Sequence, residues 1–420
     1  MDKIVVNGGK RLEGRVDISG AKNAALPLIC ASILTPGQII FDNVPRLGDI
    51  RTILKLLAIM GADIDMNWPR IKINTAELNN PIAPYELVKT MRAAILVLGP
   101  LVARFGYAKV SLPGGCAIGA RPIDLHLKGL KAMGAQVNIS KGYVEVNCTR
   151  LQGSVIDFPQ PTVGGTENLM MAATLAAGTT VINNAAREPE IIDLANLLDK
   201  MGAKIRGAGT SRIIINGCEN LQPADHSVIP DRIETGTFMV AAAITRGDVL
   251  IRKANPLHVS RIVEIMKNIG ISVETGKDFI KINSSGTIHP LDVITEAYPG
   301  FPTDMQAQFM VLALKARGKS FITESIFENR YMHVPELLRM GADIQIEKRN
   351  AIINGPCELE GTTVMATDLR ASASLILAGL IAKGTTEILR VYHLDRGYEK
   401  IENKLSSLGA DITRKPSEIY

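Results

Sequence analysis

The chain has 420 residues, a formal net charge of +5 and an aromatic content of only 4%. Its length and apolar content suffice for about two or three domains with full cores. Because the charge is modest and not gathered into basic tracts, a nucleic-acid surface is disfavoured, since such a surface needs a basic stripe or stacking aromatic residues. A small anionic ligand met by a few placed cations fits this composition better.

The amino terminus and the cysteines indicate a cytoplasmic protein. Residues 1–9 contain no hydrophobic signal core, and the longest apolar run, 93–103, is much shorter than the ~20 residues that span a bilayer. The five cysteines are odd in number and lack CxxC spacing. This pattern argues against both a disulfide framework and a thiolate zinc site. We expect neither a metal nor a cofactor.

In chain order, one element recurs six times. A run with helical apolar spacing ends at a glycine, and an alternating run follows, which predicts a helix, a left-handed cap and a strand. The glycines are separated by 73, 68, 68, 71 and 68 residues; they are Gly61, Gly134, Gly202, Gly270, Gly341 and Gly409. A second series lies 23 to 28 residues earlier and ends an alanine-rich helix in each copy, at Gly37, Gly106, Gly178, Gly247, Gly318 and Gly384. The whole length is therefore six units of about 70 residues.

The two helices of each unit differ in character. The first is apolar on nearly every face, as in 24–31 and 238–244, which implies burial all round. The second is amphipathic, as in 50–57, and should lie nearer water. We therefore predict an α/β (α+β) fold in which sheets surround buried core helices, inside-out relative to the usual α/β barrel. The pattern allows one closed array of six units or two domains of three.

Charged residues gather at the starts of the predicted core helices: Lys22, Arg92, Asp231, Asp304, Asp368 and Arg370. Cations and backbone N–H groups at a helix start form an anion site. For each aspartate a capping role is the plainer explanation, whereas a cation there calls for an external partner. Arg330 and Arg396 lie in loops, where a solvated or salt-bridged arginine is common. Taken together, these cations indicate a cleft for more than one anionic group.

Residues 113–122 form a glycine-rich segment that contains Cys116 and, five residues later, Arg121. Such a segment packs little and offers backbone N–H groups to a ligand, so Cys116 is a candidate reactive thiol in an anion-binding loop. A small buried thiol is the structural alternative. His126, His333 and His393 show no metal-ligand or Ser/His/Asp spacing and are interpreted as core or loop residues. No dinucleotide or ATP loop is present.

Nine segments carry a resemblance to a known family: 19–25, 89–93, 113–125, 186–190, 230–236, 301–308, 327–330, 366–371 and 393–399. Over essentially its entire length the chain resembles the UDP-N-acetylglucosamine 1-carboxyvinyltransferases, a family of enolpyruvyl transferases. The resemblance implies two similar domains of three units, one formed by 21–229 and the other by 1–20 with 230–420. It also implies an active site in the cleft between them and no cofactor.

The resemblance implies the reaction as well. The 3-hydroxyl of UDP-N-acetylglucosamine adds to C2 of phosphoenolpyruvate while a proton goes to C3, and the adduct then loses phosphate. This is the first committed step of peptidoglycan synthesis. Cys116 would be the general acid at C3, Asp304 the acceptor for the sugar hydroxyl, and Lys22 and Arg396 further catalytic groups. The implied phosphoenolpyruvate contacts are Lys22, Asn23, Arg121, Arg330, Arg370 and Arg396.

The implied contacts to UDP-N-acetylglucosamine are Arg92, Arg121, Pro122, Ile123, Asp124, Leu125, Thr162, Val163, Gly164, Asp304 and Ile326. Pro122 and Leu125 would flank the uracil ring, and 162–164 would offer a hydroxyl and amides to the diphosphate. Some members carry lysine where this chain has Gln160, so a cation contact to the diphosphate is expected to be missing.

Three other interpretations compete with this one. The shikimate-pathway enolpyruvyl transferases share the fold and the first substrate but are expected to lack an equivalent of the Cys116 loop. The RNA 3'-terminal phosphate cyclases are built from related units but need a histidine nucleotide acceptor and a basic RNA face. A catalytically idle repeat scaffold would not need Cys116, Asp304 and the cation set together.

Overall fold

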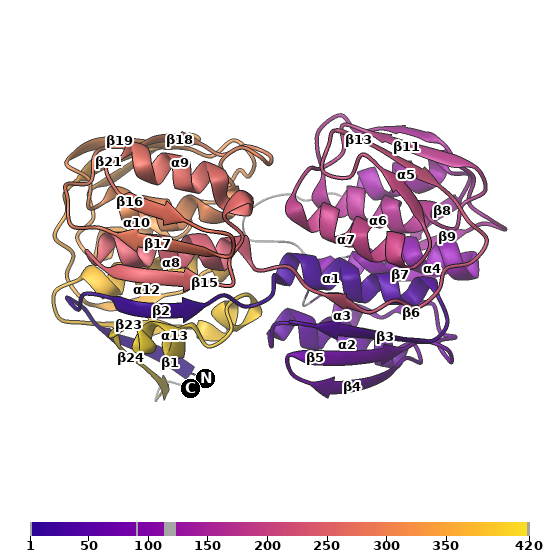
Figure 1. The fold of residues 1–420 in the computed structure, drawn as a ribbon, viewed down its shortest axis with the longest axis horizontal. Coiled ribbons are helices and arrows are strands. Elements are labelled where there is room, and N and C mark those ends of the chain that lie inside the picture. The colour runs from indigo at the N-terminus through magenta and orange to yellow at the C-terminus, as the bar shows by residue number, and fades with distance from the viewer. Residues whose placement is uncertain (1, 90, 113–122, 418–420) are drawn as a thin grey trace. The chain divides into compact units, whose positions relative to one another are not determined.

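The computed structural model describes residues 2–89, 91–112 and 123–417, and within these the chain forms two compact units (Figure 1). The central unit comprises residues 20–112 and 123–229, and the terminal unit comprises residues 2–19 and 230–417. The chain passes from one unit to the other at Ser19–Gly20 and at Ile229–Pro230. Each unit contains its own hydrophobic core.

The central unit has three core helices, α1 (Lys22–Ala31), α4 (Leu98–Phe105) and α6 (Val163–Ala173). Three amphipathic helices accompany them, α2 (Gly48–Ile59), α5 (Asp124–Ala132) and α7 (Pro189–Lys200). The short helical turns are η1 (Ser32–Leu34), α3 (Tyr85–Val88) and η2 (Arg92–Val97).

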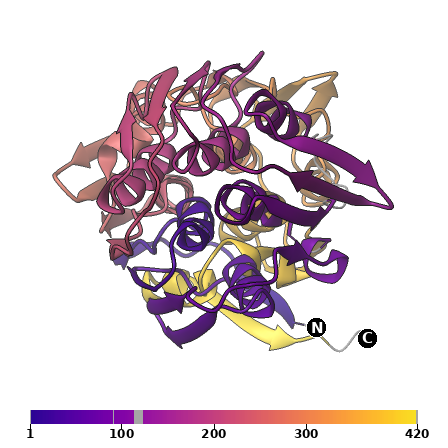
Figure 2. The same cartoon turned by 90° about the vertical axis from the view of Figure 1, so that its right-hand side faces the viewer.

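The three sheets of this unit contain β3 (Gln38–Asp42), β4 (Asp63–Asn67), β5 (Arg70–Asn74) and β14 (His226–Ser227); β6 (Ile82–Ala83), β7 (Tyr107–Ser111), β8 (Gln136–Ser140) and β9 (Tyr143–Asn147); and β10 (Val155–Asp157), β11 (Thr179–Asn183), β12 (Lys204–Arg206) and β13 (Arg212–Asn216). In Figure 2, the strands of this unit lie at the periphery around helices nearer the centre.

The terminal unit repeats the plan. Its core helices are α8 (Arg232–Ile244), α10 (Gln306–Ala313) and α12 (Leu369–Ile381), and its outer helices are α9 (Ser260–Asn268), α11 (Val334–Arg339) and α13 (Ile401–Ser407). The 3-10 turns are η3 (Pro256–Val259), η4 (Thr303–Met305) and η5 (Val391–Arg396).

Its sheets contain β2 (Glu13–Asp17), β15 (Asp248–Arg252), β16 (Ser272–Thr275) and β17 (Phe279–Asn283); β18 (Asp292–Ile294), β19 (Gly318–Thr323), β20 (Ile344–Glu347) and β21 (Asn350–Gly355); and β1 (Asp2–Asn7), β22 (Thr363–Met365), β23 (Thr385–Leu389) and β24 (Asp411–Pro416). The amino-terminal strands β1 and β2 thus complete two sheets whose other strands come from the second half of the chain.

All six sheets share one pairing scheme. The first strand, at one edge of the sheet, runs parallel to the second, as β6 does with β7. The second strand pairs antiparallel with the third, as β7 does with β9. The fourth strand is again antiparallel, as β8 is with β9. The same order recurs in each sheet, so the prediction of six repeated helix-strand units is confirmed.

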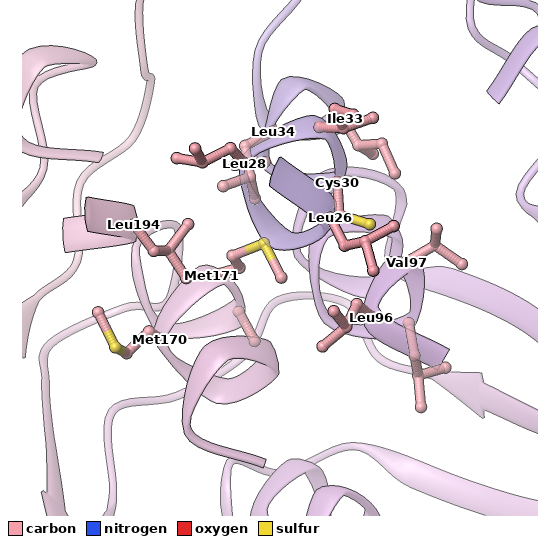
Figure 3. Packing of buried hydrophobic residues seen from close by; sticks show 14 of the residues in the cluster. Leu26, Leu28, Cys30, Ile33, Leu34, Leu96, Val97, Met170, Met171 and Leu194 are labelled. Carbon is pink, nitrogen blue, oxygen red and sulfur yellow. The ribbon is translucent and has the colours of Figure 1, made fainter. Parts of the chain in front are cut away.

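Most residues of the core helices are buried, as their composition predicts. In α1 every residue from Ala24 to Ala31 is buried, and in α8 every residue from Ile233 to Ile244 is buried. Figure 3 shows Leu26 and Cys30 of α1 packed near Met171 of α6 in the core of the central unit. Apolar side chains on all faces of a helix require neighbours on all faces. The core helices of each unit therefore occupy its interior.

The glycines that end the second helix of each unit adopt the left-handed conformation that the sequence predicts, with φ between 87° and 106°. In the earlier series Gly247 is different, because its φ is not positive. A Cβ atom at Gly247 would lie 2.5 Å from the backbone oxygen of Leu12. Glycine is required there by the close approach of the backbone of Leu12, the residue before β2, rather than by backbone conformation.

Three further properties of the described residues bear on function. None of their helices is long and apolar enough to cross a membrane. No group of three or more His, Cys, Asp or Glu side chains among them is arranged to hold a metal ion. Their cysteines, Cys30, Cys148, Cys218 and Cys357, are free thiols.

Candidate functional site

Asp304 joins two arginines in the terminal unit. It lies in η4, directly before core helix α10. Its Oδ1 accepts a 2.6 Å hydrogen bond from Arg330 Nη2, and its Oδ2 accepts one of 2.7 Å from Arg370 Nη2. The two arginine side chains are 6% and 7% exposed, whereas that of Asp304 retains 27%. The two arginines of this cluster are therefore buried, whereas the carboxylate of Asp304 can be reached from solvent.

The charges of the cluster control the protonation of Asp304. Burial by itself raises the pKa of this carboxyl, but the charges of Arg370 and Arg330 outweigh it and hold the pKa well below its usual range. Asp304 therefore stays ionised throughout the neutral range. It can accept a hydrogen bond from a hydroxyl, but it is a weak proton acceptor while both arginines are paired with it.

Arg330 has a second anchor. Its Nη1 donates to Thr303 Oγ1 at 2.8 Å, and Thr303 donates to Oε2 of the buried Glu324 at 2.8 Å. The other oxygen of Glu324 accepts from Thr295 Oγ1 and from the backbone N–H groups of 326 and 327. Glu324 thus fixes both the loop that carries Arg330 and the threonine that orients its guanidinium.

Arg370 belongs to the first turn of α12. Asp368 caps this helix by accepting from the backbone N–H groups of Arg370 and Ala371, at 2.9 and 3.1 Å. The η5 turn that ends with Arg396 packs against the same helix start, because a Cβ at Gly397 would lie 2.5 Å from Leu369 Cδ2. The terminal unit therefore places the Arg396 turn beside the helix start that bears Arg370.

The aspartates at the core-helix starts separate into two kinds. Asp231, like Asp368, is a cap, with its Oδ1 accepting from the backbone N–H groups of Ile233 and Glu234 at 2.7 and 3.0 Å. Asp304 makes no cap bond; its carboxylate is used for Arg330 and Arg370. The capping interpretation is correct for the first two and wrong for Asp304.

Lys22 opens core helix α1 in the central unit, and Asn23 follows it. Lys22 Nζ lies 3.4 Å from Oδ2 of Asp49, a buried residue in the first turn of α2. The sequence predicts an external anionic partner for a cation in this position. The structure shows an internal carboxylate, as it does for Arg370 with Asp304.

A second group in the central unit surrounds His126 of α5. Arg92 and Asp124 lie close enough to act on its charge, and a Cβ at Gly164 would be 3.5 Å from its Cε1. Burial, with a smaller contribution from Arg92, lowers the pKa of His126 to about 4, and Asp124 opposes this. Its Nδ1 lies 2.9 Å from Asn168 Nδ2. His126 is therefore a neutral core histidine that brings together the starts of η2, α5 and α6.

The remaining predicted nucleotide contacts occupy varied positions. Thr162 caps α6, its Oγ1 accepting from the Gly165 N–H at 3.3 Å, so its hydroxyl hydrogen can still donate. Val163 is exposed, as is Gln160, whereas Ile123 is buried. Leu125 packs against the core of the central unit, and Ile326 is exposed in the terminal unit.

Three predicted site residues, Cys116, Arg121 and Pro122, lie outside the described residues. Conversely, sequence reasoning missed Asp49, Thr303 and Glu324 as partners of predicted cations. Thr303 precedes Asp304 in segment 301–308, which carries the resemblance, so its position in that segment could have indicated a role in the site. Asp49 and Glu324 are separated in sequence from the cations they serve, and no local pattern indicates them.

Comparison with known proteins agrees with the resemblance over the whole chain. The family model described as EPSP synthase (3-phosphoshikimate 1-carboxyvinyltransferase) matches residues 6–405. A curated relative from Geotalea uraniireducens, named UDP-N-acetylglucosamine 1-carboxyvinyltransferase, is 56% identical over 99% of this chain and 99% of its own. A relative of the same name from Desulforapulum autotrophicum is 58% identical over 99% of this chain and 100% of its own.

Solved structures show the same fold. The enolpyruvyl transferase NikO from Streptomyces tendae matches with a TM-score of 0.91 at 24% identity, over 99% of both chains. An EPSP synthase from Acinetobacter baumannii matches with a TM-score of 0.78 at 21% identity, over 100% of both chains. The predicted fold of two similar domains, each with core helices surrounded by sheets, is thereby confirmed.

Proposed function

We infer the reaction from one premise: the chain belongs to the EPSP synthase family and, within it, to the UDP-N-acetylglucosamine 1-carboxyvinyltransferases. It transfers the enolpyruvyl group of phosphoenolpyruvate to the 3-hydroxyl of UDP-N-acetylglucosamine and releases phosphate. The observation that carries this conclusion is identity of 54 to 58% with four relatives of that name over 99% of this chain. The product would commit the sugar nucleotide to peptidoglycan synthesis in the cytoplasm.

The reaction conserves atoms by addition followed by elimination. The sugar oxygen O3 bonds to C2 of phosphoenolpyruvate, a proton is added to C3, and the proton of the sugar hydroxyl is released. A proton then leaves C3 as the bond from C2 to the phosphate oxygen breaks, which restores the double bond. One phosphate is released for each enolpyruvyl ether formed.

The arginine cluster supports the anion-binding part of this proposal. Phosphoenolpyruvate carries a phosphate and a carboxylate close together, and guanidinium groups bind such oxyanions with paired hydrogen bonds. Arg330 and Arg370 are buried, held by hydrogen bonds and already gathered on one carboxylate. We assign these two, with Lys22, Asn23, Arg121 and Arg396, to phosphoenolpyruvate.

Asp304 is assigned to the sugar hydroxyl. Burial raises the pKa of Asp304, but Arg370 and Arg330 lower it by more. While it is paired with these arginines, Asp304 therefore polarises a hydroxyl rather than removing its proton. An anion that binds the two arginines weakens their hold on Asp304 and makes it more basic. Proton acceptance would thus strengthen once phosphoenolpyruvate is bound.

Cys116 is assigned as the acid that delivers the proton to C3 of phosphoenolpyruvate. A thiol has an ordinary pKa near 8.5, so it is protonated at neutral pH and can donate, and a nearby cation would favour its thiolate form afterwards. Lys22 and Arg396 would stabilise the charge of the departing phosphate.

The group around His126 supports the sugar-nucleotide assignments in the central unit. Arg92, Asp124 and Gly164 come from three different segments and meet at one buried ring. With Arg121 through Leu125 and Thr162, this group supplies a cation, an acceptor and helix-start amides, as a uridine diphosphate requires. Gln160 offers an amide but no charge to the diphosphate.

A phosphate-release assay tests the function. Purified protein is given phosphoenolpyruvate and UDP-N-acetylglucosamine together, each alone, and phosphoenolpyruvate with shikimate 3-phosphate. We expect phosphate only with the first pair. Release with shikimate 3-phosphate and not with UDP-N-acetylglucosamine would overturn the assignment in favour of the family's other activity.

A further inference from the structure

The two arginines on Asp304 are held in the same way. Each uses Nη2 for one oxygen of Asp304 and Nη1 for a hydroxyl: Arg330 donates to Thr303 Oγ1 at 2.8 Å, and Arg370 donates to Tyr398 OH at 3.4 Å. The Arg370 guanidinium also lies 5.6 Å from the centre of the Tyr398 ring. Tyr398 follows η5 and is only 2% exposed.

The hydroxyl of Tyr398 joins all three core helices of the terminal unit. Thr237 of α8 lies 2.8 Å from it, Gln308 of α10 donates to it from Nε2 at 3.2 Å, and Arg370 belongs to α12. Thr237 and Gln308 are also buried, with 1% and 0% exposure. Gln308 Nε2 donates in addition to Thr237 Oγ1 at 3.2 Å, which closes the network.

The directions of these hydrogen bonds can be assigned. Thr237 Oγ1 donates its single hydrogen to the Ile233 carbonyl at 2.8 Å, so towards Tyr398 it can only accept. Tyr398 therefore donates to Thr237, and both lone pairs of its oxygen remain for Gln308 and Arg370. Burial raises the pKa of Tyr398, although Arg370 and Thr237 oppose this, so the hydroxyl keeps its hydrogen at neutral pH.

We propose that Tyr398 is a positioning residue for the enolpyruvyl transfer. Its hydroxyl oxygen, turned towards Arg370 by the acceptor Thr237, fixes the guanidinium that pairs with Asp304 and would receive phosphoenolpyruvate. Tyr398 itself need not touch substrate. The proposal rests on the role assigned above to Arg370 and adds to it the residues that orient that arginine.

Tyr398→Phe is the first test, because it removes the hydroxyl and keeps the ring. We expect the KM for phosphoenolpyruvate to rise about tenfold, since a hydrogen bond to a charged group is lost. The KM for UDP-N-acetylglucosamine should change by less than about twofold. A residue that only stabilised the fold would lower the amount of active enzyme and leave both KM values unchanged.

Thr237→Val gives a second test with a matched control in the same helix. Without the Thr237 oxygen, the hydroxyl hydrogen of Tyr398 loses its acceptor, because Gln308 Nε2 and Arg370 Nη1 are both donors. The hydroxyl group must then rotate away from its present orientation. Thr245→Val removes an equivalent hydroxyl at the C-cap of α8, where it donates to the i−4 carbonyl of Ala241 at 2.8 Å. We expect a raised KM for phosphoenolpyruvate in Thr237→Val only, and recovery in Thr237→Ser.

A double-mutant cycle decides whether Tyr398 acts through Arg370. Arg370→Lys lacks the planar guanidinium, so adding Tyr398→Phe to it should change kcat/KM for phosphoenolpyruvate by less than about twofold, against about tenfold in the wild-type background. Equal effects of Tyr398→Phe in the two backgrounds would overturn the proposal.

Failure of the proposed function gives a different result. An Arg370→Lys variant with wild-type KM for phosphoenolpyruvate would remove the role assigned to that arginine. Absence of turnover with UDP-N-acetylglucosamine in the wild-type protein would remove the assigned reaction. A strong effect of Arg370→Lys together with none of Tyr398→Phe would contradict the positioning role alone.

Discussion

Arg370 Nη2 and Asp304 Oδ2 form a 2.7 Å ion pair between the starts of two core helices, α12 and η4–α10. The residues are 66 positions apart in sequence, and the pair is nearly buried on the arginine side. It makes the anion-binding part of the proposed site and its proton acceptor dependent on each other. A change at Arg370 should therefore appear in the titration of Asp304.

The first prediction concerns the stability that Asp304 contributes as pH falls. Its pKa in the folded protein lies below the unfolded value, because Arg370 and Arg330 outweigh the opposing effect of burial. The contribution is then complete above the ordinary carboxyl pKa of about 4 and is lost only as pH falls towards the lower folded value.

We expect the difference in Tm between wild type and Asp304→Asn to stay constant from pH 8 to about 5 and to shrink below about 4. Differential scanning calorimetry over this range measures it. A difference that already shrinks between pH 7 and 5 would contradict the depressed pKa.

Glu167 should show the opposite dependence on pH. It is buried in α6, its Oε1 has no hydrogen-bond partner among the described residues, and burial, with Glu190 and Glu188, raises its pKa well above the ordinary value. A raised folded pKa means that stability is lost as pH rises above the unfolded pKa, by up to about 1.4 kcal/mol per pH unit.

Glu167→Gln removes this titration. The wild type should therefore lose stability relative to Glu167→Gln between about pH 4.5 and 8, as measured by urea unfolding at several pH values. A constant difference across that range would show that Glu167 does not titrate as described.

His126 should remain neutral at physiological pH. Burial and the charge of Arg92 lower its pKa to about 4, although the charge of Asp124 acts to raise it. Its ring NMR signals, assigned by comparison with His126→Gln, should be unchanged between pH 8 and 5.5 and shift only nearer pH 4. A midpoint near 6.5 would mean that the ring is solvated, and that the surroundings proposed for the nucleotide are wrong.

Cys116 is predicted to be essential. Cys116→Ala should lower kcat at least about a hundredfold, because it removes the proton donor to C3. Cys116→Asp keeps an acid and should retain part of the activity while resisting an alkylating epoxide such as fosfomycin. Cys218→Ala serves as the control, because it removes a thiol that donates a hydrogen bond to the Thr174 carbonyl. This variant should remain active and should remain sensitive to the epoxide. Full activity in Cys116→Ala would exclude the acid role.

The fold could be predicted from sequence because its signals are local. Glycines that end helices and helices apolar on every face report their own conformation and burial within a few residues. Gly247 departs from the pattern because glycine is required there by the backbone of Leu12, more than two hundred residues away. The repeat can still be recognised despite such exceptions, because the same pattern occurs in six units.

The interactions of the site could be predicted only in part. The types and positions of Lys22, Asp304, Arg330 and Arg370 were apparent, but which aspartates cap a helix and which meet an arginine depends on tertiary neighbours. The link between Thr237 and Tyr398 spans 161 positions, and no local pattern predicts it. Local sequence therefore identified the charged groups, and the structure identified the residues that orient them.

The central claim is tested most directly by identifying the product. Protein incubated with phosphoenolpyruvate, UDP-N-acetylglucosamine and shikimate 3-phosphate together is analysed by tandem mass spectrometry, with released phosphate measured in parallel. We predict an enolpyruvyl ether on O3 of the N-acetylglucosamine, equal in amount to the phosphate, and unchanged shikimate 3-phosphate. An enolpyruvyl group on shikimate 3-phosphate with unchanged UDP-N-acetylglucosamine would contradict the account.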